Sequence, residues 1–291
     1  MSILSKTKKA IKNPSRLLYL LPKNEFSGSI ENRSESDNGY YLSAVSRALK
    51  NYSKFSNFKR HPFYRLILEH TTEEQGEKYL KIIQEKNPQL LDDPTLSGLR
   101  KNDDIGNPIK HSYPGVGEIS PTTLRYIKVS SDLRDLFGDN LGDHVVEIGC
   151  GYGGQMLILD QLFEIPRYTM FDVPLVCQLI SKFIESFAIN GSYHVTTLNK
   201  YQPSKVDLVI SNYAFSELPK HLQLIYVQKV LSGASKGYLT MNSGKGGSLD
   251  ATFEKITLEE LREVLPAFEV IDEAPLTAPF NYVIVWGHKP Q

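Results

Sequence analysis

The ten residues 145–154, VVEIGCGYGG, decide how this chain folds. Their apolar first half, with an acidic residue near its end, is typical of a buried β-strand, and four glycines follow within six residues. A helical pattern begins directly afterwards, at Gln155. Glycine is required in such a turn because a Cβ would block both the backbone dihedrals and the approach of a ligand to the backbone. The stretch therefore predicts a ligand-binding turn after the first strand of an α/β domain.

From Asp143 onward, the chain alternates between strand and helix patterns. Strands are predicted at 144–149, 167–172, 193–198, 206–212, 236–242, 267–273 and 280–288. Helices are predicted at 154–164, 174–188 and 219–232, and a capping box at Thr257–Glu260 opens another that ends near Leu265. The alternation followed by a terminal hairpin predicts an α/β, Rossmann-like fold whose seven-stranded sheet is mostly parallel, with one antiparallel strand.

The first 110 residues show no such alternation. Residues 1–22 are basic and free of acids, residues 23–40 form a polar linker, and helical patterns start at Tyr41 and cover 62–70 and 73–86. We expect two parts: a basic tail with a helical extension at 1–110, acting as a lid or an oligomer contact, and the ligand-binding domain at 111–291. Residues 101–123, which span the boundary between these parts, are predicted to be a long functional loop, and a helix is predicted at 121–137.

Composition limits the classes of function. Hydrophobic residues at 41% and charged residues at 23% are typical of a soluble globular protein. Residues 1–110 hold 19 Lys/Arg against 13 Asp/Glu, whereas residues 111–291 hold 14 against 20. An acidic second half argues against nucleic acid as substrate, because phosphate binding needs basic surface. Cys150 and Cys177 form no disulfide framework, which suits the cytoplasm. The basic N-terminus leaves open a peripheral contact with anionic membrane.

The glycine spacing distinguishes two nucleotide-like ligands. NAD sites carry G-x-G-x-x-G, whereas this chain has Gly149-x-Gly151-x-Gly153. Glu147, two residues before the first glycine, would repel a phosphate but attract a cationic amino group or a sulfonium. S-adenosylmethionine (SAM) is therefore favoured over NAD, although Gly153-Gly154 keeps NAD as an alternative.

Asp172 ends the second predicted strand, 23 residues after Gly149. A carboxylate there can accept both ribose hydroxyls, which NAD and SAM share, or it can cap the helix that starts at Pro174. The strand 206–212 leads into the polar and aromatic turn 213–218. Open α/β sheets bind their ligands at this carboxyl edge.

Together, these features resemble class I SAM-dependent methyltransferases over about residues 120–291. Four stretches are similar, more narrowly, to a bacterial family of sugar O-methyltransferases: Gly106–Pro108, Ser120–Tyr126, Gly151–Gln155 and Ser211–Leu218. The resemblance implies methyl transfer to a hydroxyl of a sugar, nucleotide-sugar or glycan, as in surface-polysaccharide modification. The alternatives are a methyltransferase for another small molecule or a protein, a non-catalytic SAM-binding partner subunit in glycan assembly, and an NAD-dependent oxidoreductase.

The resemblance also assigns residues to the cofactor. It implies that Glu147, Gly149, Gly151 and Gly153 line the methionine end of SAM, that Asp172 holds the ribose, and that the adenine lies against Leu198 and Asn199. Many class I enzymes have an acidic residue at the position of Asn199. Asn212 and Tyr213 would flank the sulfonium and the acceptor. Tyr152, Arg125 and Tyr126 would contact the SAM carboxylate or the acceptor, and Gln155 would direct a polar group into the pocket.

A sugar hydroxyl needs a general base, because it is a poor nucleophile at neutral pH. Glu217, five residues past the fourth strand, is the first candidate. Alternatively, Glu217 is only an exposed residue near the start of the helix 219–232. His221, one turn further on, and His111, in the predicted loop, are the others. The glycine-rich residues 242–247 are expected to contact the acceptor, and no spacing of His, Cys and acids resembles a metal site.

Overall fold

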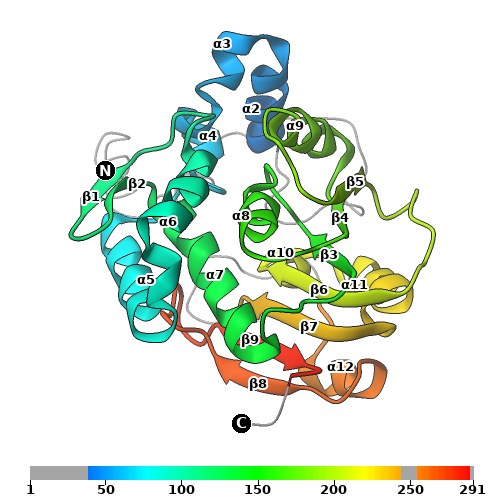
Figure 1. Ribbon diagram of the computed structural model, residues 1–291. Helices are drawn as coiled ribbons and strands as arrows, with labels where there is room; N and C mark the ends of the chain where they lie inside the picture. Colours follow the sequence, from blue (N-terminus) through cyan, green and yellow to red (C-terminus); the bar gives the residue numbers. More distant parts are fainter. Residues whose placement is uncertain (1–38, 244–253, 289–291) are drawn as a thin grey trace, which may run out of the picture.

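The computed structural model describes residues 39–243 and 254–288, which form a seven-stranded sheet covered by helices (Figure 1). The strand order is β5-β4-β3-β6-β7-β9-β8. The strands are β3 (His144–Ile148), β4 (Arg167–Phe171), β5 (Ser192–Thr196), β6 (Val206–Asn212), β7 (Ala234–Met241), β8 (Glu269–Asp272) and β9 (Tyr282–Trp286). β9 is antiparallel to both β7 and β8, and the pairs from β5 to β7 are parallel. The predicted sheet is confirmed, with each strand end within two residues of its predicted position.

Alternating side chains of the sheet enter two hydrophobic cores. Val145 of β3 and Leu208 of β6 belong to the first core, whereas Val146 and Val209, their neighbours in sequence, belong to the second. Side chains that alternate with a period of two are expected when both faces of a sheet are buried. The helices with residues in the first core include α7 (Pro121–Phe137), α8 (Gly154–Leu162) and α9 (Pro174–Ile184). The second core takes residues from α10 (Ala214–Glu217), α11 (Lys220–Tyr226), the π-helical turn Val227–Leu231 and α12 (Leu258–Val264).

Local sequence signals account for the helix ends. Ser120 caps α7 by accepting a hydrogen bond from the Thr123 N–H at 3.1 Å, and Pro121 is the first helical residue. The capping box of Thr257 and Glu260 is present at α12. The predicted helix 219–232 is α11 continued by the π-helical turn.

The extension packs on the domain rather than standing apart from it. It consists of α2 (Gly39–Lys50), α3 (Tyr52–Phe55), α4 (Pro62–Arg65), α5 (Glu73–Lys86), α6 (Asp93–Leu99) and the 3₁₀ turns Phe58–Arg60, Pro88–Leu91 and Arg100–Asp103. In Figure 1, α5 lies beside α7, and α2 lies beside α9. Tyr64 and Ile83 of the extension are fully buried in the same core as Ile127 of α7. The first core therefore includes residues from both sides of the predicted boundary at 110.

The prediction of a long open loop at 101–123 is wrong. The segment contains the hairpin of β1 (His111–Tyr113) and β2 (Gly117–Ile119). The buried carboxylate of Asp103 anchors it, accepting hydrogen bonds from the Ser120 N–H at 2.7 Å and from the hydroxyls of Ser120 and Thr123. This anchor ties the hairpin to the start of α7.

Three sequence features lie outside the described residues: the basic segment 1–22, nearly all of the predicted linker 23–40, and positions 244–247 of the glycine-rich stretch. In the described part of the chain, no helix combines the length and the apolar character that crossing a membrane requires.

Candidate active site

A cavity of about 640 Å³ lies at the carboxyl edge of the parallel strands. Residues at or just beyond the ends of β3, β4, β5, β6 and β7 line it, and Asn281, at the start of the antiparallel β9, completes this edge. Its opposite wall comes from the extension, from Tyr41 and several residues between Ile67 and Tyr79. A volume between about 300 and 1,000 Å³ is typical of small-molecule sites.

The glycine-rich turn forms the floor of the cavity. Gly149 and Gly151 line it, with φ of 74° and 60°, which few residues other than glycine adopt. A Cβ on Gly149 would collide with the Cβ of Ala214, and one on Gly151 would lie 2.8 Å from Cδ1 of Leu68. Close packing against Ala214 and Leu68, together with the positive φ, therefore requires glycine at both positions.

Asp172 lies at the cavity beside this turn. Its carboxylate accepts hydrogen bonds from the Gly151 N–H at 3.1 Å and from the Val173 N–H at 2.8 Å. The N-cap residue of α9 is Val173, and no side chain caps this helix. Asp172 is therefore not its cap. Leu198 and Asn199, after β5, line the cavity on the same side as Asp172 in the strand order.

Asn212 and Tyr213, where β6 ends, also line the cavity. Asn212 donates to Gln155 Oε1 at 3.5 Å, and its own Oδ1 is buried without a partner among the described residues. Tyr213 has φ of 69°, which is rare for a residue with a Cβ and usually marks a functional position. Its hydroxyl donates to Glu273 and lies 3.1 Å from Thr277 Oγ1, so it holds the loop that precedes β9.

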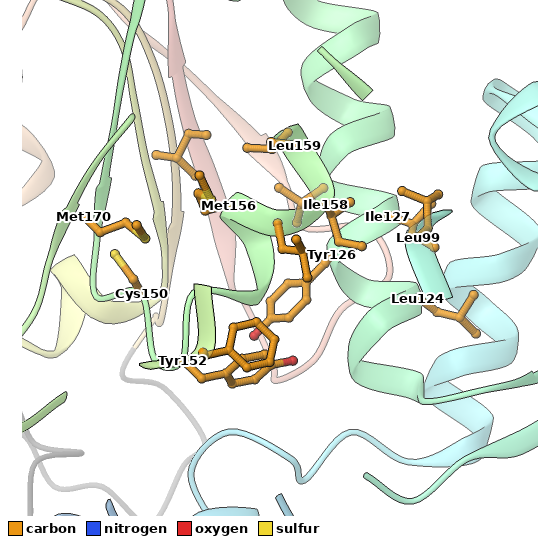
Figure 2. Packing of buried hydrophobic residues seen from close by; sticks show 14 of the residues in the cluster. Leu99, Leu124, Tyr126, Ile127, Cys150, Tyr152, Met156, Ile158, Leu159 and Met170 are labelled. Atoms are coloured by element: carbon orange, nitrogen blue, oxygen red, sulfur yellow. The ribbon is translucent and has the colours of Figure 1, made fainter. Parts of the chain in front are cut away.

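Five of the residues assigned to the cofactor or the acceptor lie outside the cavity lining: Tyr126, Tyr152, Gly153, Glu147 and Gln155. Tyr152 is fully buried, its ring packs edge-on against Phe183 at 4.9 Å, and its hydroxyl accepts from Asn102 at 3.0 Å. Figure 2 shows Tyr152 beside Tyr126 among buried side chains. Gly153 is the left-handed N-cap of α8 and packs against α9. Their neighbour Gly151 lines the cavity instead.

Glu147 and Gln155, the other two, support the site from beneath. Strand alternation puts Glu147 in the first core, where it accepts a hydrogen bond from the Tyr168 hydroxyl at 2.9 Å. Burial raises the pKa of Glu147 to about 7. Gln155 donates to the Tyr126 carbonyl and the Ser130 hydroxyl, each at 3.2 Å, and its oxygen orients Asn212.

The three candidate bases are placed differently. Glu217 lines the cavity, and its Oε1 accepts from Asn242 Nδ2 at 3.2 Å. His111 lies in β1, with Nδ1 at 3.1 Å from Glu73, and is not part of the lining. His221 is exposed on α11 and is also outside the lining. Of the three, only Glu217 is within reach of a bound ligand.

The extension supplies a candidate that the sequence did not reveal. His70 lines the cavity and is exposed there. Burial, aided by the nearby charge of Arg125, lowers the pKa of His70 to about 4, so the imidazole is neutral at pH 7. Thr71, Gln75 and Tyr79 line the same wall. No local pattern marks these residues, because only the packing of the extension brings them to the glycine turn.

Arg125, in the first turn of α7, also lines the cavity. Its guanidinium carbon lies 5.4 Å from the centroid of the Tyr126 ring, and its Nε is buried without a hydrogen-bond partner. Over residues 39–243 and 254–288, no three His, Cys, Asp or Glu side chains come together as a metal site would require.

Comparisons with known proteins concern the fold. No family model and no curated protein matches the chain. Among solved structures, it is similar to one described as the conversion of a disulfide bond into a thioacetal group during echinomycin biosynthesis. The identity is 17% and the TM-score 0.40, and the match covers 55% of this chain and 79% of that one. It is also similar to a cyclopropane synthase from Mycobacterium tuberculosis, with 15% identity, a TM-score of 0.35, and coverage of 42% and 44%.

A third similar structure is TrmK from M. capricolum, in complex with its natural cofactor product S-adenosyl-homocysteine, with 13% identity, a TM-score of 0.33, and coverage of 49% and 60%. The chain thus spans less than two thirds of the cyclopropane synthase and of TrmK. The fold itself is shown by the sheet, a Rossmann-like arrangement of parallel strands with the antiparallel β9. The chemistry has to be argued from the chain's own site.

Proposed function

We propose that this chain is a SAM-dependent O-methyltransferase that acts on a hydroxyl group of a sugar, nucleotide-sugar or glycan. The observation that carries the proposal is a single cavity in which Gly149, Gly151 and Asp172 meet neutral polar side chains on the opposite side. The first set suits a nucleoside with a cationic tail, and the second suits a hydroxyl-rich acceptor.

The residues present fit SAM. Gly149 and Gly151 line the cavity in left-handed conformations, so their backbone is exposed to a ligand without intervening side chains. Asp172 would hold the ribose hydroxyls, and Leu198 and Asn199 would border the adenine. When bound, SAM supplies an electrophilic methyl group on a positively charged sulfur.

The opposite half of the cavity fits a sugar. Its lining includes amides and hydroxyls from three separate segments: Thr71 and Gln75 of the extension, Asn242 after β7, and Thr277 and Asn281 of the loop before β9. Such side chains donate and accept at once, as sugar hydroxyls do. Hydrogen bonds within the protein, such as those from Asn242 to Glu217 and from Asn281 to Thr277, hold several of these side chains in place.

The protein's tasks in the reaction are alignment, exclusion of water and removal of the hydroxyl proton. The extension covers the glycine turn through Leu68 and thereby shields the reacting atoms from bulk water. His70 and Glu217 both line the cavity and are the candidates for the base. The imidazole of His70 is neutral at pH 7, and its low pKa makes it a weaker base than an ordinary histidine.

Calorimetric titration with SAM, S-adenosylhomocysteine and NAD tests the cofactor. We expect binding of the first two in the micromolar range and none of NAD, and tight NAD binding without SAM binding would contradict the proposal. A methyl-transfer screen over neutral and acidic sugars, nucleotide-sugars and oligosaccharides, followed by mass spectrometry, tests the acceptor. A mass increase of one methyl group on a protein or an unrelated small molecule, but on no sugar, would favour the alternative methyltransferases. Binding of SAM without any transfer would favour a non-catalytic subunit.

A further inference from the structure

Arg125 brings a fixed positive charge into the cavity. Among the described lining residues, no other Lys or Arg is present, and the lining carboxylates are Asp172 and Glu217. Asp172 accepts from the Gly151 and Val173 N–H groups, and Glu217 accepts from Asn242, so neither is committed to Arg125.

The guanidinium has no acidic partner within the described structure. No ion pair or hydrogen bond joins Arg125 to another described residue, and its Nε is among the buried nitrogens without a partner. Glu69 is the carboxylate whose charge reaches it, but Glu69 lies beyond salt-bridge distance and also interacts with the buried ammonium of Lys59. A buried guanidinium N–H normally has an acceptor, and a carboxylate is the acceptor whose geometry matches it best.

The neighbours of Arg125 place it on the acceptor side. Its charge acts on Tyr79 of α5 and on Tyr213 after β6, and both tyrosines also lie near Glu273, at the far edge of the sheet. Asp172 and Asn199 follow β4 and β5, at the opposite end of the strand order. The cavity therefore separates the residues suited to a nucleoside from the residues around Arg125.

We infer that the acceptor is an acidic sugar whose single carboxylate binds Arg125 while its hydroxyls face the neutral polar wall. This inference rests on the proposed function and narrows its substrate class. With a neutral sugar, the carboxylate of the cofactor would be the one acidic group of the bound ligands that could pair with the guanidinium. A diphosphate would bring at least two negative charges to one cation, close to the carboxylate of Glu217.

Binding to the full-length chain saturated with S-adenosylhomocysteine tests the inference, with glucuronate and galacturonate as probes and glucose and galactose as neutral counterparts. We expect the wild type to bind the uronates roughly tenfold more tightly, the difference of one charge-assisted contact. Arg125→Gln should abolish this preference and leave the affinity for S-adenosylhomocysteine within about twofold. Arg125→Lys should retain part of it, because the charge stays but the two-pronged geometry is lost.

Arg134→Gln is the matched control. Arg134 lies on the same helix, pairs with Asp139 and stacks on Phe163 away from the cavity, so its loss should not alter the preference. Equal affinity of the wild type for acidic and neutral sugars would overturn the inference.

The inference would also be overturned if Arg125→Gln weakened the binding of S-adenosylhomocysteine but not that of 5′-methylthioadenosine, which lacks the amino-acid portion. Arg125 would then serve the cofactor carboxylate. If the wild type bound no S-adenosylhomocysteine, that result would contradict the proposed function, and the inference that rests on it would fail as well.

Discussion

Glu147 and Asp172 stand at the ends of adjacent strands but lie in opposite surroundings. Asp172 lines the cavity and supports the glycine turn, whereas Glu147 is 2% exposed and faces the Tyr168 hydroxyl in the first core. Glu147 pairs with Met170 inside the sheet, whereas Asp172 follows the last residue of β4 and lies at the carboxyl edge, where the cavity is. The two carboxylates should therefore respond differently to substitution.

Replacing Glu147 by Gln should stabilise the protein at alkaline pH. The folded-state pKa of Glu147 is about 7, above the ordinary value of 4.5. Its contribution to stability is thus fully present below about pH 4.5 and is lost as the pH rises through about 7, a difference of up to about 3 kcal/mol. The gain in Tm of Glu147→Gln over the wild type should be larger at pH 8 than at pH 5. The exposed Glu118→Gln serves as control, and an equal shift at both pH values would contradict the assignment.

Replacing Asp172 by Ala should weaken the binding of S-adenosylhomocysteine by roughly tenfold or more, since a charge-assisted hydrogen bond to the ribose is lost. Asp172→Asn keeps an acceptor for the Gly151 N–H and should have a smaller effect. Calorimetry gives the affinities, and thermal unfolding checks that the fold persists. An unchanged affinity in Asp172→Ala would mean that Asp172 supports only the turn.

Replacing His70 by Ala or Glu217 by Gln separates the two candidate bases. The variant that removes the base should lower kcat about a hundredfold or more while leaving the affinity for SAM intact. If His70 is the base, the kcat of the wild type should stay level from pH 8 down to about pH 5, because the pKa of His70 is about 4. Loss of activity already at pH 6.5 would contradict a role for His70.

At the scale of elements, the extension is attached to the glycine turn through a buried lysine. Lys59, in the 3₁₀ turn Phe58–Arg60, is 1% exposed, donates from Nζ to the Asn102 carbonyl at 2.6 Å, and lies 4.1 Å from the Tyr152 ring centroid. Burial lowers the pKa of Lys59, and the charges of Glu69 and Asp103 oppose that change. The contact couples the extension to the turn that lines the cavity.

Replacing Lys59 by Met should cost about 3 kcal/mol in the free energy of unfolding, because the Asn102 carbonyl and the neighbouring carboxylates lose their cation. Urea denaturation measures the change. Lys54→Met, at an exposed position of α3, is the control and should stay within about 0.5 kcal/mol of the wild type. An unchanged free energy of unfolding in Lys59→Met would show that the aliphatic part of the side chain alone maintains this contact.

At the scale of the whole molecule, the extension and the sheet share one core. Tyr64 of the extension and Leu208 at the centre of the sheet belong to the same hydrophobic cluster, and the cavity is walled by both parts. Trp286 lies in the second core, on the other face of the sheet. Its fluorescence therefore reports on a part of the molecule remote from the extension.

We expect one unfolding transition for the entire chain. Trp286 fluorescence and far-ultraviolet circular dichroism should give the same urea midpoint, because a shared core couples the two parts. A loss of helical signal at lower urea, before the fluorescence changes, would show that residues 1–110 fold as a separate unit.

The sequence predicted features that depend on interactions between nearby residues, and it missed features that depend on contacts between residues far apart in the chain. Hydrophobic alternation and caps act over a few residues, so the strands at 144–149 and 206–212 and the helix at 121–137 were predictable to within a residue. The hairpin at 111–119 was missed because the Asp103 side chain that anchors it bonds to residues 17 and 20 positions away. Side-chain direction within the glycine turn was missed for Tyr152, because it depends on successive left-handed glycines.

By itself, the sequence determined the sheet, its one antiparallel strand and the glycine turn with Asp172 beside it, because these rest on local backbone preferences and on a period of two. Only the tertiary structure decided that His70, Gln75 and Tyr79 face Gly149 and Asp172, that Glu147 and Tyr152 point into the core, and that Arg125 is left without a partner in the cavity. These features depend on how an extension of several short helices packs against a distant sheet edge. That packing buries side chains far apart in the chain, and no pattern confined to one segment records it.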